Sequence, residues 1–246
     1  MTELLKNRRT IRKYLNRDID SELLDEILEA GIRASSTGNM QLYSIIITRD
    51  VKMKEELAPL HFNQPMVRDA PVVLTFCADF NRFNKWCRQR NAEPGYDNFL
   101  SFMNAAIDAL LVAQTVCIAA ESKGLGICYL GTVIYTAGKI IDLLKLPRGV
   151  VPVATVTLGW PGELPAMVDR LALKAVVHNE RYKDYSSEAI DDIYTAKEAR
   201  DDSKQFVEEN RKEYLAQVFT DVRYKKSDNE TFSKILLDVI KQQGFM

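Results

Sequence analysis

The spacing of apolar residues along the chain predicts several helices and four short strands. Asp20 is a residue type that often precedes a helix, and after it apolar residues recur at helical spacing at Leu23, Leu24, Ile27, Leu28 and Ile32. Helices are also predicted over residues 2–9, 50–58 and 137–145, and prolines at positions 59 and 147 would end the last two.

Runs rich in apolar and β-branched residues predict strands at residues 43–48, 71–78, 127–130 and 151–158. The second run barely alternates between apolar and polar positions, which is typical of a strand that is buried on both faces. Helices separate these strands along the sequence, so the fold class is α+β or α/β. The pattern leaves the directions of the strands open.

Residues 98–123 form the longest predicted helix, and their apolar side chains lie on all sides of it. Such a helix must be covered all round, so we expect it either at the centre of a domain or shared with a second copy of the chain. Gly124 is expected to end it. Asp108 lies within this stretch, where a charge would be costly in lipid, so a buried helix is favoured over a membrane span.

The character of the sequence changes after Gly159. Prolines and a glycine at positions 161, 162 and 165 predict a loop, and from about residue 180 the chain is rich in charge. Helices are predicted over residues 188–194, 196–214 and 231–242. We therefore expect a core of residues 1–180 and a helical C-terminal extension of residues 181–246, with partial disorder of the extension as the alternative.

The composition is that of a soluble globular protein and argues against several functions. The 246 residues are 46% hydrophobic and 27% charged, with a net charge of −1, which argues against nucleic-acid binding and against attraction to a membrane. The first residues include no apolar signal segment, so a cytoplasmic protein is expected. Two histidines give little support to nucleophilic hydrolysis. The cysteines have no zinc-site spacing and are expected to be buried free thiols: Cys77, Cys87, Cys117 and Cys128.

Two polar segments in the first quarter of the chain suit an anionic, planar ligand. The first combines Thr10 with the basic residues Lys6, Arg8, Arg9 and Arg12, and guanidinium groups match the oxygens of a phosphate. The second, residues 35–41, offers short side-chain donors and acceptors for a ribityl chain or the edge of a ring. The alternative is a solvated basic helix followed by an ordinary turn.

Glycines at positions 124, 126 and 131 resemble part of a dinucleotide-binding fingerprint, but their context differs. That fingerprint follows a strand and opens a helix, whereas here a helix precedes the glycines and a strand follows. A helix end and a tight entry into a strand explain the first two glycines. Gly131 would also let a flat ligand lie against bare backbone.

Taken together, five motifs resemble the FMN-dependent nitroreductase family, in particular its NADPH-preferring, oxygen-insensitive group. They are KNRRTIRKY, RASSTGNMQ, FCADFNR, ESKGLGICYLG, and LGWP followed by an arginine. The resemblance covers nearly the whole chain. It implies an α+β fold with a central, mainly antiparallel sheet surrounded by helices, a helical C-terminal extension, and an intertwined homodimer with two active sites at its interface.

The resemblance also implies which residues bind FMN. Arg8, within the basic motif that includes Arg9 and Thr10, would grip the phosphate together with Arg170, and Arg12 would lie near N1 and O2 of the flavin. The loop would contribute Ser35, Ser36, Thr37, Asn39 and Gln41, in part across the dimer interface. The ring would contact Gln64 and the backbone of Tyr129, Leu130 and Gly131. The sequence departs from the family pattern at Leu42-Tyr43 and at Val168.

The implied activity is the reduction of nitroaromatics and quinones by NADPH or NADH in two-electron steps, through hydride transfer at N5 of FMN in a ping-pong cycle. No side chain need act as a catalytic nucleophile. A flavin or quinone reductase, a reductive dehalogenase, a flavin-binding redox sensor without turnover, and a plain helical interaction protein are the alternatives. Basic residues of the extension would either meet the NADPH 2′-phosphate or be solvated: Arg200, Lys204, Arg223, Lys225 and Lys226.

Overall fold

The computed structural model describes all 246 residues, and packing divides them into two compact units. The first unit contains residues 1–166 and 234–246, and the second contains residues 167–233. The last helix, α11 (Lys226–Gln242), begins in the second unit and ends in the first. The predicted division into a functional core of residues 1–180 and an extension of residues 181–246 stays a prediction.

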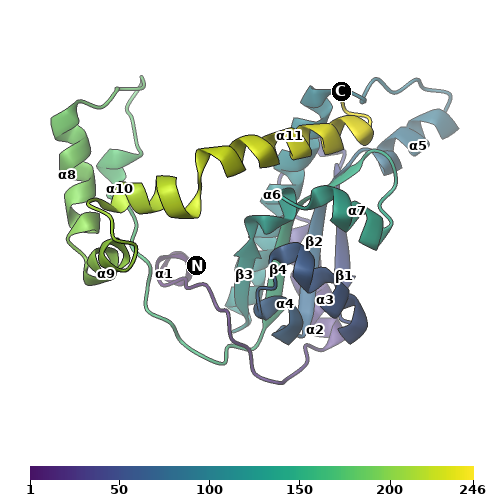
Figure 1. Cartoon of the computed structure of the whole chain (residues 1–246). Helices are drawn as coiled ribbons and strands as arrows, with labels where there is room; N and C mark the ends of the chain where they lie inside the picture. Colours follow the sequence, from purple (N-terminus) through teal and green to yellow (C-terminus); the bar gives the residue numbers. More distant parts are fainter. The chain divides into compact units, whose positions relative to one another are not determined.

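A four-stranded antiparallel sheet organises the first unit (Figure 1). Its strands lie in the order β1-β2-β4-β3, and every neighbouring pair is antiparallel. Their bounds are β1 (Tyr43–Thr48), β2 (Val72–Asp79), β3 (Gly126–Leu130) and β4 (Val150–Gly159). All four predicted strands are therefore present, β2 is buried along its whole length as expected, and the α+β class is confirmed.

One face of the sheet is covered by α6 (Phe99–Ser122) and α2 (Ser21–Gly31). Gly31 allows these two helices to approach closely, because a Cβ atom at this position would lie 2.1 Å from a methyl group of Val116. The cluster between the helices and the sheet is the largest apolar core of the chain, and α6 runs through its centre. The predicted helix is confirmed, and Gly124 follows it with a φ of +82°.

The opposite face of the sheet is covered by shorter helices. A further apolar cluster lies at one end of the sheet. The covering elements are α3 (Val51–Leu57), η2 (Ala58–His61), α4 (Met66–Asp69), η3 (Gly131–Ile134) and α7 (Ala137–Leu144). At the sheet's end, Phe80 and Phe245 pack with residues of α6 and the last turns of α11. A helix that the sequence did not indicate, α5 (Asn81–Gln89), follows β2 directly.

The helices of the second unit confirm some predictions and correct one. It contains η4 (Leu173–Ala175), α8 (Ser187–Glu198), α9 (Asp201–Glu209), α10 (Leu215–Val218) and a π-helical turn over Phe219–Arg223. The prediction of one helix over residues 196–214 is wrong. The chain leaves helical geometry at Arg200, whose φ and ψ are −65° and 145°, and α9 already ends at Glu209.

One helix, α6, is long and apolar enough to cross a membrane by length and composition, but half of its most apolar window is buried inside the chain. The sheet and α2 provide that cover, as expected for a core helix. Several apolar side chains of α6 are exposed: Phe99, Leu100, Met103, Ile107, Leu110 and Leu111. We expected α6 to be covered all round, but within this chain only one side of the helix is covered.

Candidate flavin site

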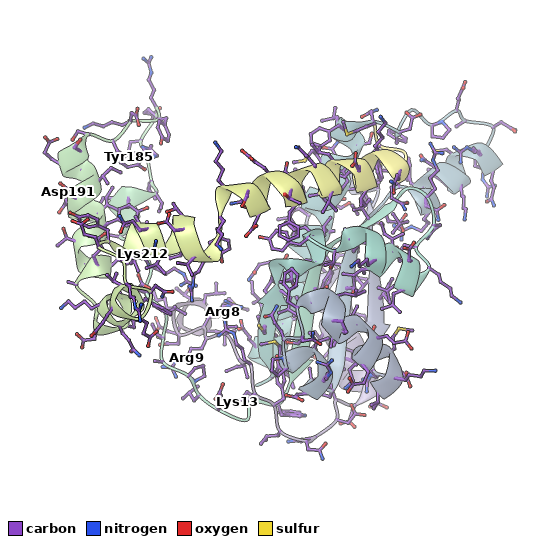
Figure 2. All side chains as sticks on the ribbon, in the orientation of Figure 1. Arg8, Arg9, Lys13, Tyr185, Asp191 and Lys212 are labelled. Atoms are coloured by element: carbon purple, nitrogen blue, oxygen red, sulfur yellow. The ribbon has the colours of Figure 1, made fainter.

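The basic N-terminal segment runs along the free edge of β3. Helix α1 (Thr2–Lys6) is shorter than predicted, and after it the N–H of Ile11 donates to the carbonyl of Ile127 at 2.9 Å. Gly126 makes this approach possible, because a Cβ atom there would lie 2.6 Å from the Ile11 side chain. The segment carries Arg8, Arg9 and Lys13, which Figure 2 labels.

Arg8 and Arg9 both bury their Nε atoms without a hydrogen-bond partner. Arg8 Nε lies 3.2 Å from Oε1 of Glu121 in the last turn of α6, so this contact is ionic rather than a hydrogen bond. Burial raises the pKa of Glu121, and the charge of Arg8 opposes that rise. Buried N–H groups without acceptors are costly, so these two guanidinium groups suit an anionic ligand such as a phosphate.

Arg12 is exposed and lies beside Cys128 of β3. Burial raises the pKa of the Cys128 thiol, while the charges of Arg12 and Arg8 act in the opposite direction. On the same side of the sheet, the hydroxyl of Tyr14 lies 2.7 Å from Oγ1 of Thr157. These contacts fix the segment against β3 and β4 and leave the Arg12 guanidinium accessible to a ligand.

The end of β3 offers open backbone. Leu130 is buried, whereas Tyr129 is partly exposed and Gly131 is exposed at the start of η3. A Cβ atom at Gly131 would meet no atom of the chain within 4 Å. Packing within the chain therefore does not require a glycine here, and the space beside it is free for a flat ligand.

Gln64 follows η2 closely in the sequence, and η2 contacts η3 at the end of β3. Gln64 therefore lies near this end of the strand. The N–H of Gln64 donates to the carbonyl of His61 at 3.2 Å, and Nδ1 of His61 lies 2.8 Å from Oγ1 of Thr132. His61 is fully buried, and burial lowers its pKa to about 4. Neither His61 nor Thr132 was among the predicted site residues.

The loop of residues 35–41 is held by Asp108, a buried residue of α6. Ser36 Oγ donates to Oδ2 at 2.7 Å, and the N–H and hydroxyl of Thr37 both donate to Oδ1 at 2.9 Å. The N–H of Leu42 also donates to Oδ2, at 3.2 Å. The hydroxyl protons of Ser36 and Thr37, which we expected to serve a ligand, are thus engaged by this carboxylate.

The tip of the same loop has unusual backbone geometry. Gly38, Asn39 and Gln41 have φ values of +55°, +56° and +49°, in the left-handed region that non-glycine residues rarely adopt. Ser36 Oγ accepts from the N–H of Gln41 at 2.8 Å, and the Gln41 amide donates to Asn39 Oδ1 at 2.7 Å. Ser35 and Asn39 remain exposed. A backbone held in such a conformation is often found where a ligand binds.

Within one chain, this loop and the arginine segment lie far apart. Their anchors, Asp108 and Glu121, are thirteen residues apart on the continuous helix α6. At 1.5 Å per residue, that separation is roughly 20 Å along the helix axis. The structure therefore brings Arg8, Arg9, Arg12, Gln64 and Gly131 to the neighbourhood of β3 and η3, and holds the loop at another part of α6.

Arg170 belongs to the second unit, so its predicted convergence with Arg8 stays a prediction. Its Nη1 donates to the carbonyl of Asp169 at 2.8 Å, and the Asp169 carboxylate pairs with Lys197 of α8 at 2.8 Å. The hydrogen bond and the charge of Lys197 lower the pKa of Asp169. The ion pair between Asp169 and Lys197 thus fixes the loop to α8 at the residue before Arg170.

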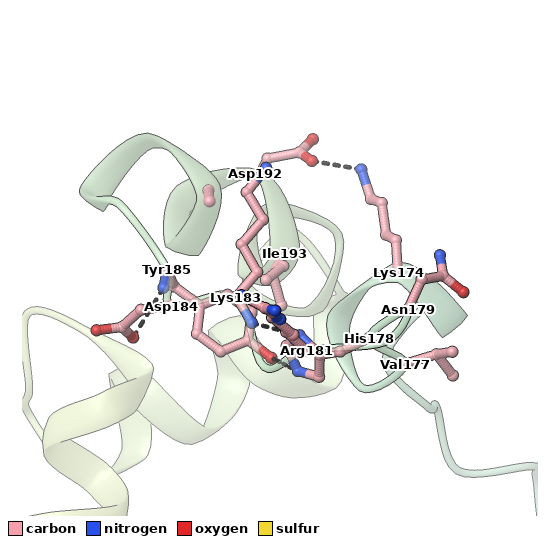
Figure 3. A pocket seen from close by; sticks show the side chains of 11 residues that line it. Lys174, Val177, His178, Asn179, Arg181, Lys183, Asp184, Tyr185, Asp192 and Ile193 are labelled. Carbon is pink, nitrogen blue, oxygen red and sulfur yellow. Dashed lines mark hydrogen bonds and ion pairs between the residues drawn. The ribbon is translucent and has the colours of Figure 1, made fainter.

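Some basic residues of the second unit have partners of their own. Arg200 pairs with Asp202 at 2.8 Å, and the guanidinium of Arg223 lies 4.6 Å from the centre of the Phe206 ring. Figure 3 shows a hollow in this unit where the hydroxyl of Tyr185 lies 3.2 Å from Nε2 of His178, and where Arg181 and Lys183 are among the lining residues. These contacts favour a structural or solvated role for Arg200 and Arg223.

The model of the Nitroreductase family matches residues 5–160. The chain belongs to the nitroreductase family. It is similar to an FMN reductase (NADPH) from Bacillus subtilis, with 35% identity over 182 residues and 73% of each chain covered. It is also similar to an oxygen-insensitive NADPH nitroreductase from Salmonella typhimurium, with 34% identity over 181 residues and 74% of each chain covered.

A crystal structure from Bacteroides fragilis, of a protein named as an oxidoreductase, has a TM-score of 0.98 and 58% identity, with 99% of each chain covered. The nitroreductase-like fold and the family resemblance are therefore confirmed. This nitroreductase-family chain is an enzyme of the NAD(P)H-dependent FMN reductase and nitroreductase type. Its four cysteines are buried free thiols, as predicted.

The first prediction concerns Asp108. Replacing it with asparagine (Asp108→Asn) removes the charge that accepts four hydrogen bonds and turns an N–H₂ group toward donors, so we expect unfolding free energy to fall by about 3 kcal/mol. Chemical denaturation measures this change, and hydrogen exchange at Thr37 and Leu42 should accelerate. The exposed carboxylate of Asp142 on α7 provides a control, since Asp142→Asn should change stability by less than about 0.5 kcal/mol. Equal effects of both variants would contradict the anchoring role.

The second prediction concerns pH. The pKa of His61 is about 4 in the folded chain and near 6.5 in an unfolded chain, so the unfolded state binds this proton more readily. The neutral histidine contributes its full stability above pH 6.5, and this stability is lost as pH falls toward 4, by about 3 kcal/mol in total. Denaturation of the wild type and of His61→Asn across this range should show a smaller decline in the variant. Parallel declines would show that His61 does not titrate in this way.

Proposed function

We propose that this chain uses FMN to transfer electron pairs from NADPH or NADH to nitroaromatic and quinone acceptors, in alternating half-reactions. The observation that carries the proposal is the pair of buried guanidinium Nε atoms of Arg8 and Arg9 that make no hydrogen bond within the chain. They belong to the segment that runs along β3, and this strand ends at the open backbone of Gly131. Positive charge for a phosphate and free space for a flat ring lie along the same strand edge, which is the donor set that FMN requires.

In this proposal, Arg8, Arg9 and Thr10 hold the phosphate, with Arg170 from the second unit. Arg12 supplies positive charge near N1 and O2, where negative charge develops on reduction. Gln64 and the backbone of Tyr129, Leu130 and Gly131 orient the ring. When bound, FMN supplies the hydride chemistry at N5, so the protein's own residues bind, orient and exclude water.

No side chain of the site has the properties of a nucleophile. Burial raises the pKa of the Cys128 thiol and raises that of the Cys117 thiol to about 12, so both stay protonated near neutral pH. His61 is buried and neutral. These properties favour the proposal that the cofactor, rather than a residue, carries the reaction.

We also propose that the active enzyme is a homodimer. The exposed apolar residues of α6 follow helical spacing along one side, from Phe99 to Leu111, and such a contiguous apolar face is typical of an interface. A second copy packed there would cover the helix on all sides. It would also allow the Asp108-anchored loop of one copy to complete the site at β3 of the other. The two clusters lie roughly 20 Å apart within one chain, so a site shared between two copies would bring these polar segments together.

A flavin reductase is the second candidate, because the relative from Bacillus subtilis is named an FMN reductase. One experiment addresses both candidates: the absorbance spectrum of the purified protein before and after anaerobic addition of NADPH. We expect a yellow protein that is bleached by NADPH and recovers on addition of a nitroaromatic, a quinone or free flavin, and the fastest acceptor identifies the activity. A colourless protein that takes up no added FMN would overturn the proposal.

A third prediction tests the phosphate contact. Arg8→Ala removes a charge-assisted hydrogen bond worth about 1.5–3 kcal/mol, so FMN affinity should fall roughly tenfold to a hundredfold. Fluorescence titration of the apoprotein with FMN measures this change. Lys13→Ala is the control, because Lys13 lies on the same segment with a side chain that is mostly exposed. An Arg8→Ala protein that is folded and binds FMN as tightly as the wild type would remove Arg8 from the site.

A fourth prediction tests the dimer. Ile107→Asp places a charge in the middle of the apolar face of α6, so the protein should become monomeric and lose FMN binding together with activity. Light scattering coupled to size-exclusion chromatography measures the mass. Val51→Asp introduces the same charge at an exposed apolar position at the start of α3 and should leave the dimer intact. A wild-type monomer that binds FMN fully would contradict the shared site.

A further inference from the structure

His61 stands at the junction of two elements that border the proposed flavin site. Its carbonyl accepts from the N–H of Gln64, and its side chain contacts the hydroxyl of Thr132, the residue after Gly131. A second hydrogen bond lies nearby, from the hydroxyl of Thr136, just before α7, to the carbonyl of Leu60 in η2 at 2.7 Å. One buried histidine thus links the two places where the ring is expected to lie.

The surroundings of His61 indicate which ring nitrogen carries the proton. Nε2 is buried and has no hydrogen-bond partner, while Nδ1 faces the Thr132 hydroxyl at 2.8 Å. A neutral imidazole carries one N–H, and a buried N–H without an acceptor is rarer in proteins than an under-used acceptor. We therefore assign the proton to Nδ1, which donates to Oγ1 of Thr132.

This tautomer determines what the Thr132 hydroxyl can do. Because its oxygen accepts from His61, its own proton is free to donate elsewhere, and the chain offers it no other acceptor. Thr132 is partly exposed next to Gly131, where the space beside the backbone is open. The hydroxyl is therefore a donor available to a ligand in that space.

We infer that His61 is a positioning residue of the flavin site: it fixes the Gly131–Thr132 turn and orients the Thr132 hydroxyl to donate to the bound ring. This inference rests on the proposed function. Stability alone does not account for the histidine, since an apolar side chain would fill this buried position without an unpartnered nitrogen. A buried side chain with an unpartnered polar atom is unfavourable for folding. Its position beside an open space indicates that it serves the ligand site.

The inference predicts an effect on the cofactor's redox balance. A hydrogen-bond donor at the ring stabilises the reduced form more than the oxidised form, because reduction adds negative charge. Removing the donor should weaken binding of reduced FMN about tenfold more than binding of oxidised FMN. For a two-electron couple, that ratio corresponds to a midpoint potential lower by about 30 mV.

The experiment compares matched variants of the full-length protein loaded with FMN. Thr132→Val removes the hydroxyl and keeps the shape, and Thr132→Ser keeps the hydroxyl. His61→Leu removes the donor, and His61→Asn places an amide N–H as many bonds from Cβ as Nδ1. Spectroelectrochemical titration gives the midpoint potential of each variant, fluorescence titration gives the affinity for oxidised FMN, and thermal unfolding of the apoprotein reports folding.

We expect Thr132→Val and His61→Leu each to lower the potential by about 30 mV, and the double variant to lower it no further, because both act through one hydroxyl. Thr132→Ser and His61→Asn should stay close to the wild type. Unchanged potentials in Thr132→Val, or equal shifts in Thr132→Ser and Thr132→Val, would overturn the inference while the proposed function stands. A wild type that binds no FMN would instead overturn the proposed function, and the role of His61 with it.

Discussion

The packing of α6 against the antiparallel sheet is the constraint on which the rest of the molecule depends. This helix fills the largest core cluster. Its two carboxylates, the buried Asp108 and the partly buried Glu121, contact the two polar segments of the candidate site. Because an α-helix has a fixed rise, it also fixes the distance between those segments. The positions of the two polar segments follow from where these carboxylates occur along α6.

The two carboxylates interact with their segments in different ways. Asp108 is fully satisfied by four donors, so it organises the loop of residues 36–42 and leaves little capacity for a ligand. Glu121 meets Arg8 without a hydrogen bond, and burial raises its pKa. One anchor therefore completes local structure, while the other leaves donors of Arg8 available. The candidate phosphate site lies beside the second.

Much of the fold was predictable because it depends on local patterns. The four strands are β-branched and apolar, so they were found to within one or two residues at each end, and Gly124 marked the end of α6. The break between α8 and α9 was missed, because the sequence near Arg200 has no proline or glycine. Helix α5 was missed because it is short and mainly polar.

The contacts that organise the candidate site could be predicted only in part, and the contacts that could not share one physical cause. Arg8, Arg12 and Gly131 carry signals in their own residue types, namely charge and the lack of a side chain. The importance of Asp108 and His61 arises from partners far away in the sequence, Thr37 and Thr132. Such contacts exist only after folding, so a single sequence gives no sign of them. From the sequence alone, Asp108 indicated only that the apolar stretch of residues 98–123 does not span a membrane.

The burial of all four cysteines has a consequence for the durability of the enzyme. Quinones and partly reduced nitroaromatics are electrophiles, and thiolates attack them much faster than thiols do. Burial raises the pKa of Cys77 and Cys117 to about 12 and raises that of Cys128 as well, so reactive sulfur is both shielded and protonated. Burial of this kind protects the protein from alkylation by electrophiles such as the acceptors proposed above.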